Sequence, residues 1–115
     1  PLALQQQLPV TGQFDVIWLF SVFTHLDPED SAAMLRVLRK HIAPQGKLIF
    51  TCRINDTVED FIDRIPEIPL LRAVYSSKLM ESLIIDNEWA IDHFYQKDPR
   101  DFIRNYYICS PGTKP

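Results

Sequence analysis

The chain has 115 residues, a length typical of a single domain, with 46% hydrophobic and 23% charged residues. Its net charge of -3 offers no basic surface to a phosphate backbone, which argues against nucleic-acid binding. No apolar run is long enough to span a bilayer, and the N-terminus lacks the features of a signal peptide, so we expect a cytoplasmic protein with no membrane partner.

The first predicted strand lies in Phe14–Leu26 (FDVIWLFSVFTHL), after residues 1–13, which read as a loop or tail. Residues 16–20 are all apolar and do not alternate with polar residues, which predicts a strand covered on both faces, as in a parallel sheet. A buried helix is the alternative, but the β-branched and aromatic residues favour a strand. Ser21–Leu26 would then lie at the sheet edge where α/β proteins bind ligands.

A helix is predicted next, with Asp27 as its N-cap and Pro28 in its first position. Apolar residues continue at helical spacing to Ile42. Pro44 is expected to stop the helix and Gly46 to adopt a positive φ in the following turn.

The second predicted strand, Lys47–Arg53, completes a right-handed parallel crossover, which would place residues 52–55 beside Ser21–Leu26. Residues 56–75 are the least regular part: 57–64 suit a short amphipathic helix, and Pro66 and Pro69 then impose an extended link. This connection leaves the ligand edge, so it is either a lid or substrate-binding segment or mere packing.

The last third is predicted as one helix and two strands. Ser76 or Ser77 caps a helix over Lys78–Asp86, and Asn87 ends it in the left-handed region. The strands Trp89–Tyr95 and Phe102–Cys109 are joined by residues 96–101, a connection of hairpin length, and residues 110–115 read as a tail.

Three motifs at this spacing carry a resemblance: FDVI (14–17), SVFTHL (21–26) and, after the helix, APQGKLIFT (43–51). From Phe14 to about Cys109 the chain resembles the second half of class I S-adenosylmethionine-dependent methyltransferases. The resemblance implies a partial Rossmann-like α/β sheet with flanking helices. Its two parallel strands and C-terminal antiparallel hairpin would take the family order 4-5-7-6, in a single domain spanning residues 1–115. The family usually has glycine where Gln45 and Asn87 stand here.

The family's first three strands have no counterpart in the sequence. They carry a glycine-rich loop for the methionine end of the cofactor and an acidic residue for its ribose, whereas the only glycines here are Gly12, Gly46 and Gly112. We therefore expect a fragment that is inactive alone and binds S-adenosylmethionine weakly or not at all. The strand near Val16–Phe20 would be a bare edge, covered in a homodimer or by residues 1–10.

The resemblance assigns Phe20, Ser21 and Val22 to the methionine and sulfonium end of the cofactor. It places Thr24 at the substrate mouth with His25, the candidate general base. His25 has the alternative role of ordering the loop and helix start, and Ser21 that of a small residue ending the strand.

Arg53 and Asn55 are candidate substrate-binding residues at the end of the second strand. Arg53 would meet a carboxylate or phosphate of the substrate, or pair with Asp56 or Glu59.

No metal site is predicted. Asp27, Glu29 and Asp30 suit a helix N-terminus, and His41 and His93 suit surface or strand positions. Trp18, Trp89, Tyr106 and Tyr107 are expected in the core or on a sheet face, and Cys52 and Cys109 as buried, reduced thiols.

The sequence thus favours a methyltransferase acting on a small-molecule acceptor. One rival is a non-catalytic α/β remnant that serves as an association module. Another doubly wound nucleotide-binding fold ranks last, because the chain has no phosphate loop.

Overall fold

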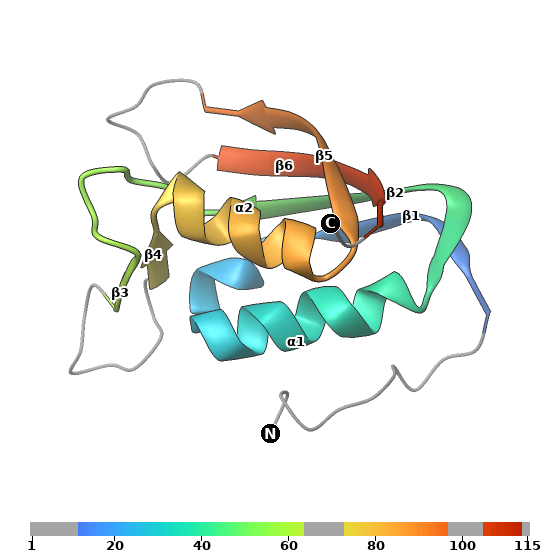
Figure 1. The fold of residues 1–115 in the computed structure, drawn as a ribbon, viewed down its shortest axis with the longest axis horizontal. Helices are drawn as coiled ribbons and strands as arrows, with labels where there is room; N and C mark the ends of the chain where they lie inside the picture. Colours follow the sequence, from blue (N-terminus) through green and yellow to red (C-terminus); the bar gives the residue numbers. More distant parts are fainter. Residues whose placement is uncertain (1–11, 64–72, 97–104, 114–115) are drawn as a thin grey trace.

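The computed structural model describes residues 12–63, 73–96 and 105–113. Within these ranges the chain forms a four-stranded sheet in the order β1-β2-β6-β5, a separate β3–β4 ribbon, two α-helices and one turn of 3-10 helix (Figure 1). The elements are β1 (Phe14–Leu19), η2 (Phe23–His25), α1 (Pro28–Arg39), β2 (Ile42–Cys52), β3 (Phe61–Asp63), β4 (Ala73–Tyr75), α2 (Ser77–Asp86), β5 (Trp89–Tyr95) and β6 (Asn105–Pro111).

The strand order and directions confirm the predicted fold class. β1 runs parallel to β2, with Ile17 opposite Leu48 and Leu19 opposite Phe50. β6 lies antiparallel to β2 on one side and to β5 on the other. The result is the expected mixed sheet, with two parallel strands followed by an antiparallel hairpin.

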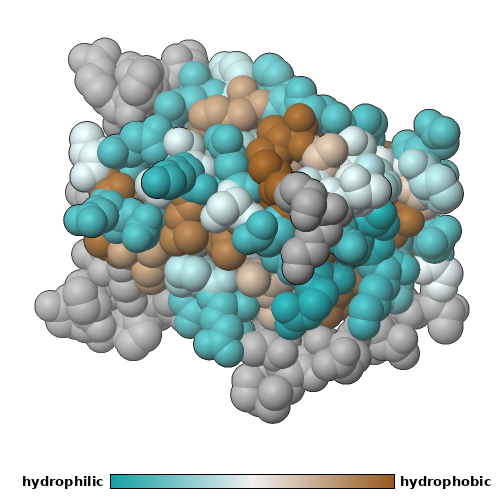
Figure 2. All heavy atoms as spheres, viewed as in Figure 1, coloured by the Kyte–Doolittle hydropathy of each residue, from teal (hydrophilic) through white to brown (hydrophobic). Residues whose placement is uncertain are grey.

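Both helices cover the same face of this sheet (Figure 1). Their N-caps are as predicted: the Asp27 carboxylate accepts a hydrogen bond from the backbone N–H of Asp30 at 2.8 Å, and the Ser76 hydroxyl accepts one from Leu79 at 3.1 Å. The surface on the helix side is mostly hydrophilic, with separate hydrophobic patches (Figure 2). Neither helix is long and apolar enough to cross a membrane, nor is any other helix in the described residues.

The predicted end of the first helix is wrong. α1 ends at Arg39, and β2 already begins at Ile42 and continues through Pro44. Ile42 is buried and lies opposite Phe14, so its apolar side chain belongs to the strand. Gly46 does not have a positive φ; a Cβ there would lie 2.7 Å from Cδ1 of Ile42 and 3.0 Å from the Ala43 carbonyl oxygen, so a larger residue would force these neighbours to shift.

The predicted helix over residues 57–64 is also wrong. The Asn55 side-chain oxygen accepts hydrogen bonds from the backbone N–H and the hydroxyl of Thr57, at 3.0 and 2.7 Å, which closes a turn in place of a helical start. Asp60 has a φ of 63°, and Phe61 then pairs with Tyr75 in the β3–β4 ribbon.

Two further boundaries differ from the prediction. Ser110 and Pro111 belong to β6 and not to a tail, because they pair with the first two residues of β5. The left-handed residue after α2 is Glu88, with a φ of 69°, whereas Asn87 has a φ of -101°. β5 has the predicted bounds.

Three predictions concern residues that lie outside the described ranges. They are the loop or tail at residues 1–11, the link through Pro66 and Pro69, and most of the 96–101 connection with the first residues of the last predicted strand.

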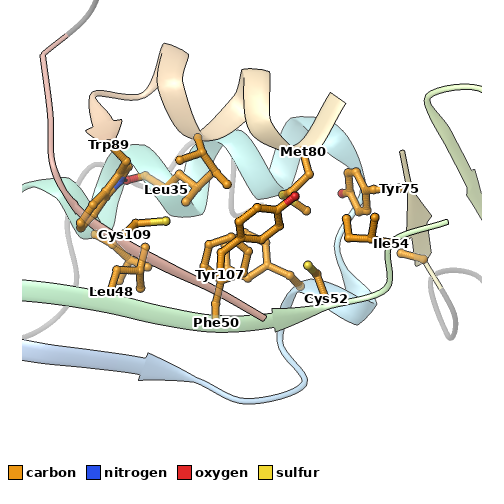
Figure 3. Packing of buried hydrophobic residues seen from close by; sticks show 14 of the residues in the cluster. Leu35, Leu48, Phe50, Cys52, Ile54, Tyr75, Met80, Trp89, Tyr107 and Cys109 are labelled. Carbon is orange, nitrogen blue, oxygen red and sulfur yellow. The ribbon is translucent and has the colours of Figure 1, made fainter. Parts of the chain in front are cut away.

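The core lies between the helices and the sheet (Figure 3). The rings of Phe50 and Tyr107 lie 5.6 Å apart, and the indole N–H of Trp89 donates to the Leu35 carbonyl at 2.9 Å.

The two cysteines lie at opposite ends of the pairing between β2 and β6. Cys109 lies opposite Leu48, and Cys52 lies opposite Asn105. Both thiols are buried and unpaired, as predicted. Burial raises the pKa of Cys109 to about 12, and burial together with Cys109 raises the pKa of Cys52 further.

β1 is not covered on both faces as its sequence predicts. The exposed fractions of Val16, Trp18 and Phe20 are 57%, 63% and 73%. Both helices lie on the opposite face, and β2 is the only strand paired with β1 among the described residues. In the part of the chain that the structure describes, the helices therefore cover one face of the sheet and leave the other open, and Trp18 belongs to the open one.

Candidate functional site

The carboxyl ends of β1 and β2 lie side by side because the two strands are parallel neighbours. From β1 the chain turns across this edge through η2 and reaches α1 at Asp27, a segment of residues 20–27 that we name the edge loop. Open α/β sheets bind their ligands at this position, so the edge loop is the candidate site.

The bend at Ser21 fixes the course of the edge loop. Ser21 has a φ of 60°, a left-handed conformation that costs a non-glycine residue about 1 to 3 kcal/mol and is kept where the surroundings impose it. Its backbone N–H donates to the Thr51 hydroxyl at 2.7 Å, and its carbonyl accepts from the Thr24 hydroxyl at 3.1 Å. β2 therefore determines how the chain leaves β1.

The loop divides into an anchored part and a presented part. Phe23 is fully buried and its ring lies 4.4 Å from that of Phe50, while Thr24 is 4% exposed. Phe20, Ser21 and His25 are exposed, and Val22 is half-buried. The sequence-predicted cofactor residues thus lie together on the surface of the loop, whereas the Thr24 side chain is turned inward to support it.

Tyr75 ties this loop to the β3–β4 ribbon. Its hydroxyl donates to the Leu26 carbonyl at 2.6 Å and lies 2.7 Å from the Ser31 hydroxyl, although 44 or more residues separate these partners in sequence. Burial is the main reason that the pKa of Tyr75 is raised, so the hydroxyl keeps its proton and remains a donor. Sequence reasoning missed Tyr75, because a tyrosine before the cap of a helix gives no local sign of a contact so distant in sequence.

Arg53 and Asn55 follow β2 at the same edge. An Nη of Arg53 donates to the Thr24 carbonyl at 3.4 Å, so the guanidinium reaches the edge loop as the sequence predicts. The side-chain oxygen of Asn55 is engaged by Thr57, and its backbone N–H donates to the Tyr75 carbonyl. Asn55 therefore contributes to the frame around the loop.

The chemical groups presented at this edge are hydroxyls, an imidazole and a guanidinium. No set of three or more His, Cys, Asp or Glu residues able to hold a metal occurs in the described parts of the chain, and Asp27 acts as a helix cap. His93 is exposed, but His41 is buried, contrary to prediction, with its Nδ1 3.2 Å from the Gly12 carbonyl. His25 is thus the one histidine on the edge loop.

A hollow of about 540 Å³ lies away from the edge loop, at the C-terminal ends of α1 and α2. It is lined by Arg36, Arg39, Lys40, Asp86, Asn87 and Glu88. Arg39 already spans it, donating to the carbonyls of Glu88 at 2.8 Å and of Gly112 at 3.3 Å. Since the edge loop meets the opposite end of α1, we assign this hollow no part in the candidate site.

No protein-family model matches the sequence, and no curated protein matches it. Solved structures with the same fold do exist. An S-adenosylmethionine-dependent methyltransferase from Clostridium acetobutylicum aligns over 97% of this chain and 63% of its own, with a TM-score of 0.69 and 12% identity. The glycopeptide N-methyltransferase MtfA, complexed with S-adenosyl-L-methionine, aligns over 97% and 59%, with a TM-score of 0.66 and 9% identity.

A third structure, described as a pericyclic reaction enzyme, aligns over 96% of this chain and 29% of its own, with a TM-score of 0.67 and 11% identity. The chain thus spans about three-fifths or less of these structures. At such low identity the likeness shows the fold alone: the chain has a partial methyltransferase fold, as its resemblance implies.

Proposed function

We propose that this chain forms the carboxyl-terminal half of an S-adenosylmethionine-dependent methyltransferase and lines one side of its cofactor site. The observation that carries the proposal is the position of the edge loop at the carboxyl ends of two parallel strands, where Thr51 holds Ser21 in a left-handed bend. The chain shares its fold with a structure that is complexed with the cofactor.

The described residues fit one wall of such a site. The exposed Phe20 and Ser21 and the half-buried Val22 offer a surface of fixed course to the methionine and sulfonium end. None of the three glycines lies in a turn between a strand and a helix: Gly12 precedes β1, Gly46 lies within β2, and Gly112 follows β6. The wall that cradles the methionine end must then come from residues outside this sequence.

The cofactor, when bound, supplies an activated methyl group. Because alignment of the methyl donor with the acceptor supplies most of the rate acceleration in a methyl transfer, the main task of the chain is to hold the edge loop rigid. Thr24, Thr51 and Tyr75 do so through their hydrogen bonds. We assign His25 the role of accepting a proton from the acceptor, and Arg53 that of attracting an acidic group on a small-molecule acceptor.

Titration of the 115-residue chain with S-adenosylhomocysteine, followed by NMR, tests this proposal. We expect weak binding, with shifts confined to residues 20–25 and 51–55. Thr51→Val removes the hydroxyl that fixes Ser21 and should weaken binding, whereas the control Thr113→Val, at an exposed site after β6, should not.

Shifts centred on the hollow beside Arg39, or no shifts at millimolar ligand, would contradict the assignment of the edge loop. Micromolar affinity would contradict the half-site, because it would mean that these residues alone hold the cofactor.

A second candidate is a non-catalytic module used for association. The exposed apolar side chains of β1 favour it, and the pericyclic reaction enzyme illustrates that the fold does not fix the chemistry. Cofactor-induced shifts at the edge loop would favour the methyltransferase, and their absence would favour the association module.

A further inference from the structure

We propose that the hollow at the C-terminal ends of α1 and α2 binds a small zwitterion, a molecule of the amino-acid class that carries one ammonium and one carboxylate. We name this hollow the helix-end site. The proposal goes beyond the proposed function and does not depend on it.

The helix-end site lies where two parallel helices end together. α1 and α2 run side by side in the same direction, so their C-termini meet at one end of the helix layer (Figure 1). The hollow there has a volume of about 540 Å³, within the range of about 300 to 1,000 Å³ that is usual for small-molecule sites. β5, the strand farthest from β1, begins directly after the α2 end of the hollow, so a strand added beside β1 would not reach the site.

The two walls of the site carry opposite charges. On the α1 wall, Arg36 lies three positions before Arg39 and four before Lys40, so the three cations share one face at the end of the helix. The α2 wall has the carboxylates of Asp86 and Glu88. In the described part of the chain neither carboxylate forms an ion pair with Arg36 or Arg39. Opposite charges therefore line an open space without neutralising each other directly.

The acidic wall is unfavourable for the helix that carries it. The C-terminus of a helix has about half a unit of negative charge, so basic residues stabilise it and acidic residues do not. α1 follows this rule with Arg36 and Arg39 in its last turn, whereas α2 has no basic residue in its last turn and ends in Asp86. Departures of this kind are expected at functional sites, and a bound ammonium would supply the missing positive charge.

One cation of the site is held in a fixed position. Nε of Arg39 donates to the Glu88 carbonyl at 2.8 Å, Nη2 donates to the Gly112 carbonyl at 3.3 Å, and Cζ lies 5.9 Å from the centre of the Trp89 ring. These two bonds use two of the five N–H donors of the guanidinium, so others can bind a carboxylate. Arg39 is thus a preorganised anchor, which reduces the ordering cost of binding.

The balance of charge selects the class of ligand. The three cations face two carboxylates and two helix ends of about half a negative unit each, so the opposite contributions nearly cancel. A simple anion or cation would be attracted by one wall and repelled by the other. A zwitterion can place its carboxylate at Arg36 and Arg39 and its ammonium at Asp86 and Glu88. Because salt and water screen these groups, we expect millimolar affinity.

Titration of the 115-residue chain with ε-aminocaproate, followed by NMR at low ionic strength, tests the proposal. We expect saturable shifts in residues 36–40 and 86–89 and none in residues 20–25. Caproate and hexylamine are matched probes, because each has the same number of carbons and only one of the two charges. Each should bind at least about fivefold more weakly than ε-aminocaproate. Equal affinity for all three probes would overturn the zwitterion.

Neutral variants of the two walls test the assigned residues. Arg36→Gln should weaken ε-aminocaproate binding by about three- to tenfold and should strengthen hexylamine binding, because it removes a repelling charge. Asp86→Asn should weaken ε-aminocaproate binding to a similar extent and should strengthen caproate binding. The controls Glu29→Gln and Lys78→Gln remove one charge of each sign from exposed positions in the first turns of α1 and α2, and they should change neither affinity.

An equal loss of affinity in the controls would show a general effect of net charge and would overturn the site. The absence of saturable shifts in residues 36–40 and 86–89 would overturn it as well. Circular dichroism confirms that each variant is folded. S-adenosylhomocysteine also has an ammonium and a carboxylate, so its titration is repeated in Arg36→Gln. Shifts at the edge loop should persist in this variant, so the two proposals succeed or fail separately.

Discussion

The two faces of the four-stranded sheet have similar side chains and opposite surroundings. On the covered face, Phe50 and Tyr107 are fully buried beneath the helices. On the open face, Trp18 is 63% exposed, while Tyr95 and Tyr106 stack at 5.1 Å with Tyr95 still 39% exposed. The comparison shows that the apolar character of a strand does not by itself determine which of its faces is buried. The position of the helices determines which face is buried.

Replacing a phenylalanine on each face should give the largest contrast. Phe50→Ala removes a ring packed between Phe23 and Tyr107 and should lower the free energy of unfolding by about 3 to 5 kcal/mol. Phe20→Ala deletes the same atoms from a 73% exposed site, and in dilute protein it should change stability by about 0.5 kcal/mol or less. Urea denaturation measures both, and equal losses would contradict the distinction between the faces.

A hydroxyl on the covered side should have an intermediate effect. Tyr75→Phe keeps the ring against Phe61 but removes the bonds to Leu26 and Ser31, which should cost about 1 to 2 kcal/mol. It should also speed hydrogen exchange in the edge loop. The control Tyr95→Phe, on the open face, should alter neither measurement, and unchanged exchange in Tyr75→Phe would show that Tyr75 does not hold the loop.

The smallest effect should come from the ion pair on the open face. Lys47 donates to Asp92 at 2.7 Å and Ser110 donates to the same carboxylate, so the pKa of Asp92 lies below its ordinary value of 3.8. The pair therefore stabilises the fold above pH 3.8, and its contribution is lost as the pH falls through the lowered pKa. Both side chains are more than a third exposed, so Asp92→Asn should cost only a few tenths of a kcal/mol at pH 7, and still less in 1 M salt.

Sequence patterns predict this fold well where the interactions are local. Residue type and spacing predict the helix caps at Asp27 and Ser76 and the bounds of β5. They also predict the parallel pairing of β1 with β2. The end of α1 does not, because Ile42 has the spacing of a helix residue but is buried opposite Phe14.

The candidate site is predicted only in part for the same reason. The family resemblance assigns Phe20, Ser21 and Val22 to the cofactor, and the structure places them directly after β1, while their role stays a prediction. Thr51 and Tyr75, which fix the loop, act over 30 and 49 residues of sequence, and such contacts leave no pattern in the chain.

The burial of both cysteines has a practical consequence. Since Cys52 and Cys109 are the only two in the sequence and neither reaches the surface, the native chain should resist thiol-directed labels. A cysteine introduced at an exposed position such as Ser82, on α2, would then carry a fluorophore at a single known place. The label would report on α2 without any change to the buried core.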